Sequence, residues 1–546
     1  MSALRTTDAS SWSSCHEMKI GLALSGGGFR AASFHLGVLK RLEELGVLPR
    51  VAVVSTVSGG AIVGAFYALR CATRGDGTPG SYSIRELIDE LRPKLTRNLR
   101  GRALFGRPDH ALRTAVSFAI PSVRRMPLVV DALDDLFYGG HRLSELPGWI
   151  LINATNLRTG KAWKFLRDRA GDYLAGATDK TAEIRVAEAV GASAAYPVLV
   201  DPYPFRSRWQ DLRADLLDED RWQRPVGRSA TDFSRWRRRY GKPSGEVTFP
   251  LVDGGVYDNE GLNGLRGAGV THAILSNASP PEGDLARGGT LHTLEQAIDV
   301  MHARLGAVTR QVAHEMTHAV HPNEARGSLR NLAAAIRHAA QDAPEVGDRL
   351  ISLASRVESA ADVGWPPRGH QFSATAQVLL HSTAVARNES AQYEDALDVP
   401  VEERGLAEAL VEEIARVRTD LDALEPDVFD LLLAQGYFVA DSYLKTGIPH
   451  VVRDCSEGRD PASRALRPAW EWALKAIEHA NAHPAHTASI LRTAGRTAKL
   501  WGRCETNTLK VWLAMSAILA AAMLLGALAA TYVVLSRWVP WPYWRP

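Results

Sequence analysis

Two short apolar runs near the start of the chain are each followed by a glycine-containing turn and a helix-patterned segment. Ile20 to Ser25 leads into Gly26-Gly27-Gly28, and apolar residues then recur at three- and four-residue intervals. Val51 to Val54, rich in β-branched residues, leads into a Ser/Gly turn and a segment of small residues through Leu69. This repeated order of strand, turn and helix predicts a mainly parallel α/β sheet, with the turns at the C-terminal ends of the strands.

Three more apolar runs predict further strands of this sheet, at Trp149 to Ala154, Val247 to Val252 and His272 to Ser276. The intervening segment 85–146 reads as largely helical and mildly basic. Residues 206–246 interrupt the α/β rhythm with Trp residues among many Arg residues. We expect this insertion to be either a solvated basic surface or a cap that meets anionic lipid headgroups.

Composition narrows the class of protein. The 546 residues are 46% hydrophobic and 23% charged, which are globular values. The net charge of +3 is too balanced to predict a nucleic-acid partner. The four cysteines show no CxxC spacing, so neither a disulfide framework nor a cysteine zinc site is indicated.

Residues 511–536 contain no charged side chain and are long enough, as a helix, to cross a hydrocarbon core about 30 Å thick. Aromatic residues flank the run on both sides, as at membrane interfaces. More basic residues precede it than follow it, which places the large N-terminal part in the cytoplasm. No signal peptide is recognisable at the N-terminus. The sequence therefore predicts a single-pass membrane protein with a C-terminal anchor.

These features divide the chain into five parts. They are a flexible N-terminal segment (1–18), an α/β domain (19–285, with the basic insertion 206–246), an Ala-rich helical extension of unknown role (286–505), a transmembrane helix (511–535) and a short tail (536–546).

The triple-glycine turn can bring backbone N–H groups close to a ligand at a helix N-terminus, where negative charge is favoured. A phosphate or the oxyanion of a tetrahedral intermediate would fit there. A dinucleotide site would need a glycine at Ala31 and an acidic residue about 20 positions on, and neither is present. The Gly-Lys-Ser/Thr of a kinase-type phosphate loop is also missing.

Two further turns carry a candidate nucleophile, Ser58, and a candidate catalytic carboxylate, Asp253. Ser58 follows the second strand, and Gly59 and Gly60 give it the small neighbours that a sharp strand-to-helix turn requires. Asp253 ends the run Val247 to Val252 beside Gly254 and Gly255. Each turn alone also fits an ordinary structural turn. Their order, each at a strand end, is far more specific than any one of them.

The order Gly-Gly-Gly-x-Arg, Val-Ser-Gly-Gly and Asp-Gly-Gly resembles the patatin-like phospholipases, a family of serine acyl hydrolases. Gly191 to Pro197 is similar to the family's Ala-Ser-x-Ala-x-Pro segment, while Arg418 to Asp422 and Gln435 to Tyr437 resemble a downstream segment of bacterial members. The resemblance covers about 18–277 and reaches Tyr443 more loosely. Thr56 departs mildly from the usual nucleophile turn.

The resemblance implies a patatin-like three-layer fold and roles for individual residues. Ser58 would be the nucleophile and Asp253 its general base, with no histidine and no cofactor. Gly26, Gly27 and Gly28, with Arg30 nearby, would form the oxyanion hole. The implied substrate is a phospholipid or another lipid ester, cleaved through an acyl-serine intermediate at a membrane, which the composition and the family segments suggest is a bacterial inner membrane.

Two alternatives come from other classes of protein. His314-Glu315-Met316-Thr317-His318 has the His-Glu-x-x-His spacing of zinc peptidases, on a helix-patterned stretch that would put both imidazoles on one face. A third ligand is unassigned, with His321, Glu324, His338 and Glu358 available, so no metal site is predicted. The other alternative is a non-catalytic membrane scaffold that keeps the patatin fold. The oligomeric state is not readable from the sequence.

Overall fold

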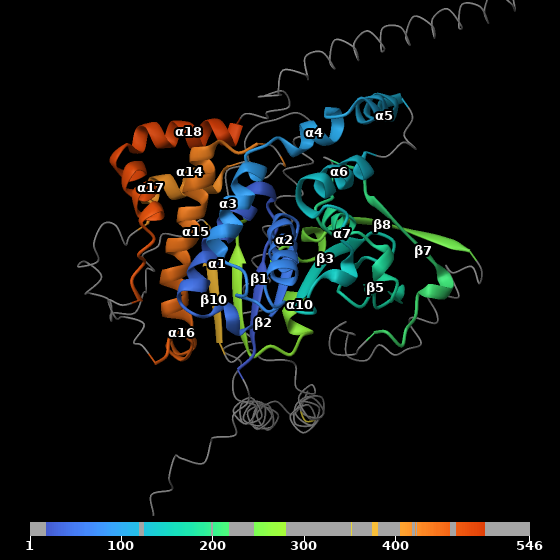
Figure 1. The fold of residues 1–546 in the computed structure, drawn as a ribbon, viewed down its shortest axis with the longest axis horizontal. Coiled ribbons are helices and arrows are strands. Elements are labelled where there is room, and N and C mark those ends of the chain that lie inside the picture. Colours follow the sequence, from blue (N-terminus) through green and yellow to red (C-terminus); the bar gives the residue numbers. More distant parts are fainter. Residues whose placement is uncertain are drawn as a thin grey trace, which may run out of the picture.

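The computed structural model describes residues 18–119, 125–197, 200–217, 245–279, 351, 374–380, 405–417, 421, 423–458 and 466–496. A central β-sheet runs through this part of the chain, with helices packed against it (Figure 1). The predicted transmembrane helix, the His314–His318 motif and most of the basic insertion lie outside the described residues. Within the described residues, no helix is long and apolar enough to cross a membrane.

The sheet is mostly parallel on one side and antiparallel on the other. Its main path runs β10-β9-β1-β2-β3-β4-β5-β6, and β8 pairs with both β3 and β7. The first four pairings along this path, from β10 to β3, are parallel, and those that follow are antiparallel. The strands are β1 (Ile20–Leu24), β2 (Val51–Val57), β3 (Ile150–Asn156), β4 (Lys161–Phe165), β5 (Ala170–Asp172), β6 (Gly176–Thr178), β7 (Tyr203–Arg208), β8 (Glu246–Asp253), β9 (His272–Asn277) and β10 (Ala374–Leu379).

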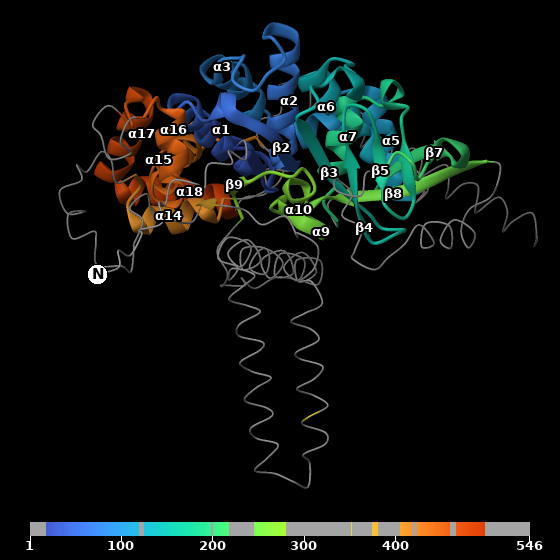
Figure 2. The same cartoon turned by 90° about the horizontal axis from the view of Figure 1, so that it is seen from below.

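Helices cover both faces of the sheet. Figure 2 shows α1 and α2 on one side and α9 and α10 on the other. The described helices are α1 (Gly28–Glu44), α2 (Gly59–Arg74), α3 (Ile84–Leu95), α4 (Leu99–Phe105), α5 (Pro108–Ala119), α6 (Met126–Leu133), α7 (Val186–Ser193), α9 (Gly255–Asp258), α10 (Leu262–Arg266), α14 (Glu408–Ala415), α15 (Pro426–Gly447), α16 (Pro449–Cys455), α17 (Glu471–Ala482) and α18 (Pro484–Arg496).

Strand β1 is apolar throughout because both of its faces are buried. Ile20, Leu22 and Leu24 join the large core with α1, whereas Ala23 joins a smaller core with Leu265 of α10. Alternate residues of a strand point to opposite faces, so a strand between two helical layers needs apolar residues at every position. The predicted α/β fold with a mostly parallel sheet is confirmed.

The helical extension is partly integrated into the sheet domain. Helices are found in its described C-terminal part, as predicted, but β10 also comes from it and pairs in parallel with β9. Helix α15 packs along α1 and β10 (Figure 1). The Ala-rich pattern of this region did not indicate a strand.

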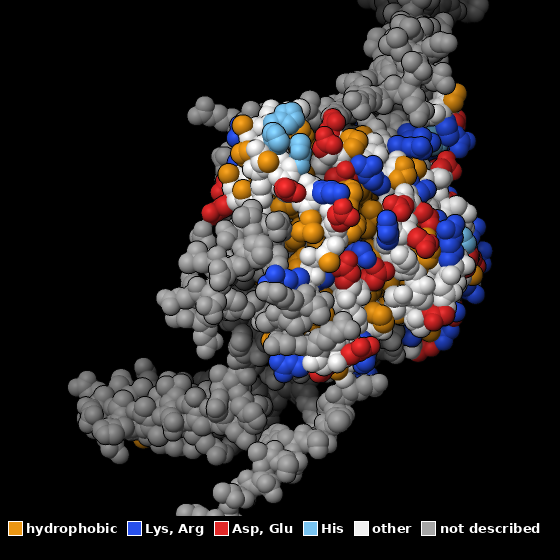
Figure 3. Space-filling view, turned by 60° about the vertical axis from the view of Figure 1, so that its left-hand side comes forward, with side chains coloured by type: hydrophobic (Ala, Val, Ile, Leu, Met, Phe, Trp, Pro, Cys, Tyr) orange, Lys and Arg blue, Asp and Glu red, His pale blue; other side chains and the backbone are white. Residues whose placement is uncertain are grey.

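The start of the predicted basic insertion, residues 206–208, also differs in structure from the prediction. Its first residues belong to β7, which pairs antiparallel with β8 over its whole length. On the molecular face drawn in Figure 3, acidic and basic side chains are interspersed, in keeping with the small net charge.

Candidate active site

Ser58 occupies a strained turn between β2 and α2. Its backbone has φ 50° and ψ −115°, and Glu457 is the other described non-glycine residue with positive φ. Such a conformation costs about 1–3 kcal/mol and persists where the surroundings impose it. The Gly28 backbone is part of these surroundings. A Cβ on Gly59 would lie 2.1 Å from the Gly28 carbonyl oxygen, so the close contact requires glycine at position 59. The serine turn is thus pressed against the glycine turn.

Asp253 reaches Ser58 from a strand that runs in the opposite direction. The last three residues of β8 pair antiparallel with the end of β3, so that Asp253 lies opposite Ala154. The Asp253 Oδ1 accepts the Gly255 N–H at 2.7 Å. Burial raises the pKa of Asp253 to about 6, and the neighbouring Ser58 side chain and the Gly255 N–H oppose the rise.

Ser193, at the end of α7, connects the two turns. Its hydroxyl accepts the N–H of Ser58 at 2.8 Å and donates to the Asn153 carbonyl at 2.6 Å. Its own carbonyl accepts the Gly254 N–H at 3.1 Å, and the Asp253 N–H donates to the next-but-one carbonyl, that of Ala195, at 2.9 Å. The Gly191 to Pro197 segment therefore supports both Ser58 and Asp253. Sequence reasoning noticed the segment but gave it no role.

The glycine turn offers backbone donors beside Ser58, but not from all three residues. Gly26 N–H donates to the Asn259 carbonyl at 3.0 Å. Within the described part of the chain, the N–H groups of Gly27 and Gly28 have no acceptor. Both residues have positive φ, 132° and 55°, and Gly28 begins α1. Two orphan amides at a helix N-terminus suit a developing negative charge.

Arg30 does not contribute a guanidinium free for an oxyanion. Its side chain is 2% exposed. Nη1 donates to the carbonyls of Ala415 and Val417, and Nη2 to that of Ala278. Arg30 follows the glycine turn by two residues, but its side chain donates to backbone carbonyls, a direction that the motif alone could not reveal.

Asn259 and His35 are two supporting residues that sequence reasoning missed. A Cβ on Gly26 would lie 2.4 Å from Asn259 Oδ1, and the Asn259 amide donates to Ser279 Oγ at 2.8 Å. His35 is fully buried under the turn, with Nε2 3.0 Å from the Ser25 carbonyl, which also accepts the Gly60 N–H. Burial lowers the pKa of His35 to about 4, so its imidazole is neutral at pH 7. It is a structural group here, not a general base.

The rival zinc site gains no support from the described residues. His314 and His318, with the four available third ligands, lie outside them. Among the residues described, no cluster of three or more His, Cys, Asp or Glu side chains is arranged to hold a metal ion.

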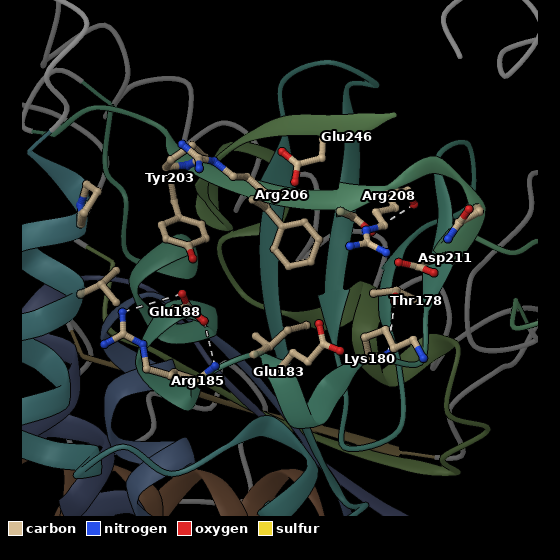
Figure 4. Close-up of a pocket in the computed structure, with 17 residues that line it drawn as sticks. Thr178, Lys180, Glu183, Arg185, Glu188, Tyr203, Arg206, Arg208, Asp211 and Glu246 are labelled. Atoms are coloured by element: carbon tan, nitrogen blue, oxygen red, sulfur yellow. Dashed lines mark hydrogen bonds and ion pairs between the residues drawn. The ribbon is translucent and has the colours of Figure 1, made fainter. Parts of the chain in front are cut away.

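A cavity of about 810 Å³ lies away from the three turns, between the start of α7 and the β7–β8 pair (Figure 4). Side chains of both signs line it, among them Lys180, Arg206, Glu183 and Glu246. None of the predicted site residues lines it. We therefore place the candidate active site at the three turns and not in this cavity.

Comparison with known proteins gives one family match and several distant structural likenesses. Residues 22–265 match the family model described as patatin-like phospholipase. Among solved structures, human GIVD cytosolic phospholipase A2 aligns with a TM-score of 0.38 and 12% identity, over 81% of this chain and 63% of that one. Its complex with methyl γ-linolenyl fluorophosphonate and terbium chloride aligns with a TM-score of 0.37 and 12% identity, over 81% and 60%.

VipD from Legionella pneumophila aligns with a TM-score of 0.24 and 11% identity, over 89% of this chain and 94% of that one. The chain spans about 60% of the length of the human phospholipase chains. No curated protein sequence matches it. The matched segment includes the glycine turn, the Ser58 turn and the Asp253 loop, so residues 22–265 form a patatin-like phospholipase domain.

Proposed function

We propose that this protein is a membrane-anchored lipid acyl hydrolase that uses Ser58 as nucleophile and Asp253 as general base. The observation that carries the proposal is the placement of the Ser58 side chain beside a buried carboxyl group, that of Asp253, whose pKa is raised to about 6. A carboxylate with its usual pKa near 3.9 is a poor acceptor for a serine proton. Burial makes Asp253 a stronger base, and it is still ionised at pH 7.

In the proposed reaction, Ser58 Oγ attacks the ester carbonyl carbon while its proton moves to Asp253. The carbonyl oxygen becomes an oxyanion, stabilised by the N–H groups of Gly27 and Gly28. Collapse of this intermediate breaks the bond to the alcohol, which takes the proton from Asp253, and leaves an acyl-serine ester. Water then attacks the ester, gives a proton to Asp253 and releases the fatty acid. Ser58 recovers the proton.

A serine-directed fluorophosphonate tests this proposal on the detergent-solubilised full chain. We expect covalent labelling at Ser58, located by mass mapping, and loss of both labelling and ester hydrolysis in Ser58→Ala, by at least about 10³-fold. Ser33→Ala is the matched control, since Ser33 is a buried serine of α1 whose hydroxyl donates to a backbone carbonyl. It should keep both activities. An unlabelled but folded wild-type protein would favour the non-catalytic scaffold instead.

The anchor is the second part of the proposal and rests on the uncharged run 511–536. Tethering would keep the hydrolase at the surface that holds its substrate, with the catalytic domain on the cytoplasmic side. Removal of the chain from residue 511 onward is expected to move the protein from the membrane fraction to the supernatant. If the shortened protein still sediments with membranes in 0.5 M salt, another part of the chain binds lipid.

A further inference from the structure

The glycine turn is held at both of its ends by the backbone of one residue, Ala278. Residue Ala278 directly follows β9, and its N–H donates to Ser25 Oγ at 2.9 Å. Its carbonyl accepts from Arg30 Nη2 at 2.7 Å. Ser25 and Arg30 flank Gly26, Gly27 and Gly28 on the two sides. Glycine tolerates many backbone conformations, so contacts of the flanking side chains, Ser25 and Arg30, are needed to fix the conformation of the turn.

The other side of the Arg30 guanidinium faces the end of α14. Nη1 lies 2.9 Å from the carbonyl oxygen of Ala415, the last residue of α14, and 2.8 Å from that of Val417. The last carbonyls of a helix lack intrahelical donors and carry partial negative charge. Arg30 satisfies the Ala415 carbonyl and that of Val417, two residues beyond the helix, because its planar group presents donors in fixed directions.

Helix α14 is in turn held by the last described helices. Glu413 accepts from Arg492 of α18 at 2.8 Å. The Asn481 side chain accepts the N–H of Ala407, which caps α14, and donates to the carbonyl of Gly405. A chain of contacts thus leads from α17 and α18 through α14 and Arg30 to the glycine turn. All of these helices lie outside the segment that matches the family.

We propose that Arg30 is a positioning residue that sets the glycine turn through the α14 carbonyls, so that hydrolysis depends on the docking of the C-terminal helices. This inference rests on the proposed function, because the turn supplies the oxyanion donors there. Arg30 touches no reacting atom in this scheme. Loss of its contacts lets the Gly27 and Gly28 amides drift from the oxyanion, and a misplacement of about 1 Å can cost about 10²-fold in rate.

The first test compares Arg30→Met and Arg30→Lys with wild type in ester hydrolysis by the full chain. Both variants lose the planar fork, but the lysine ammonium can still donate to one or two of the three carbonyls. We expect kcat to fall by about 10–100-fold in Arg30→Met and by less in Arg30→Lys. KM should change by less than about twofold, since substrate binding is not altered. A structural role alone would lower the unfolding temperature and leave kcat of the folded protein unchanged.

The second test loosens α14 without touching the active site. The double variant Glu413→Ala, Asn481→Ala removes the ion pair and the side-chain hydrogen bonds that tie α14 to α17 and α18. We expect kcat to fall at least about fivefold with KM unchanged. Glu412→Gln is the control on the same helix, where the side chain is largely exposed and 3.9 Å from Arg416. It should behave as wild type. This pair of variants keeps the inference testable if Arg30→Met does not fold.

Each outcome decides the inference. A fall in kcat in both the Arg30 and the α14 variants supports it. A fall in the Arg30 variants alone overturns it and points to direct action of the guanidinium on the oxyanion. Unchanged kcat in all variants also overturns it. Failure of the proposed function looks different, because wild type itself would then neither hydrolyse esters nor label at Ser58.

Discussion

Asp253→Asn is expected to abolish hydrolysis and, at the same time, to stabilise the protein at neutral and alkaline pH. The carboxyl group is 3% exposed, and its pKa is raised to about 6 by burial. Holding it ionised in the folded state at pH 8 costs about 3 kcal/mol relative to the unfolded chain. Asparagine has no charge to bury, and its Oδ1 can still accept the Gly255 N–H. It has no basic oxygen for the Ser58 proton.

The sign of the effect follows from linkage. The folded pKa of Asp253 lies above its unfolded value, so its contribution to stability is complete below about pH 3.8 and is lost as the pH rises through about 6. Asp253→Asn should therefore match wild type near pH 4 and exceed it by about 1–3 kcal/mol at pH 8. Denaturant unfolding at the two pH values measures this difference. In wild type, kcat/KM should fall as the pH drops below about 6, with the slope of a single proton.

Asp258→Asn is the control for this prediction. Asp258 is also buried, five residues further on, and burial raises its pKa. Its oxygens accept the N–H groups of Gly261 and Asn263 instead of a serine hydroxyl. Its replacement should lower stability, because the asparagine amide nitrogen would face one of these two N–H donors, and it should leave the reaction intact. If Asp253→Asn destabilises the fold at both pH values and keeps activity, Asp253 is a turn residue and not a base.

Gly37→Ala is expected to destabilise the protein by about 3 kcal/mol. Gly37 lies where α1 meets α15, and a Cβ there would be 1.9 Å from the carbonyl oxygen of Leu433 and 2.7 Å from the nitrogen of Tyr437. On the opposite helix, a Cβ at Gly436 would be 2.1 Å from the Phe34 carbonyl oxygen. Both obstacles are backbone atoms, which cannot rotate away as a side chain can. The two helices must move apart, and the packing between them is lost.

Thermal unfolding of the full chain measures this effect, with Gly148→Ala as its control. A Cβ at Gly148 would meet nothing within 4 Å, so that substitution should change stability by less than about 0.5 kcal/mol. Equal stability of the two variants would contradict the close approach of α1 and α15. The Gln435 to Tyr437 segment lies at this contact: Gly436 permits the approach, and the Tyr437 hydroxyl donates to Glu44 of α1.

The sequence predicted the elements that follow simple periodicity and the turns that carry family motifs. It did not predict that β8 enters the sheet antiparallel, because strand direction depends on long-range pairing that a local pattern does not contain. Strand β10 was missed because six residues in an Ala-rich region give a weak signal beside longer helical patterns. The contacts of Arg30 could not be predicted either, because its hydrogen-bond acceptors are the carbonyls of residues 278, 415 and 417, which are far from it in the sequence.

The close packing of α1 against α15 also has a consequence for the order in which the protein is made. When residue 265 leaves the ribosome, the chain already contains the serine, the aspartate and the glycine turn. Helix α15 begins at Pro426, and at 5–20 residues per second its synthesis starts roughly 10–30 s later. Until then α1 lacks its cover and Arg30 lacks the α14 carbonyls. A nascent chain that has not yet reached α14 and α15 therefore holds the three turns without the contacts that fix Arg30, and under the proposed function it is an incomplete hydrolase.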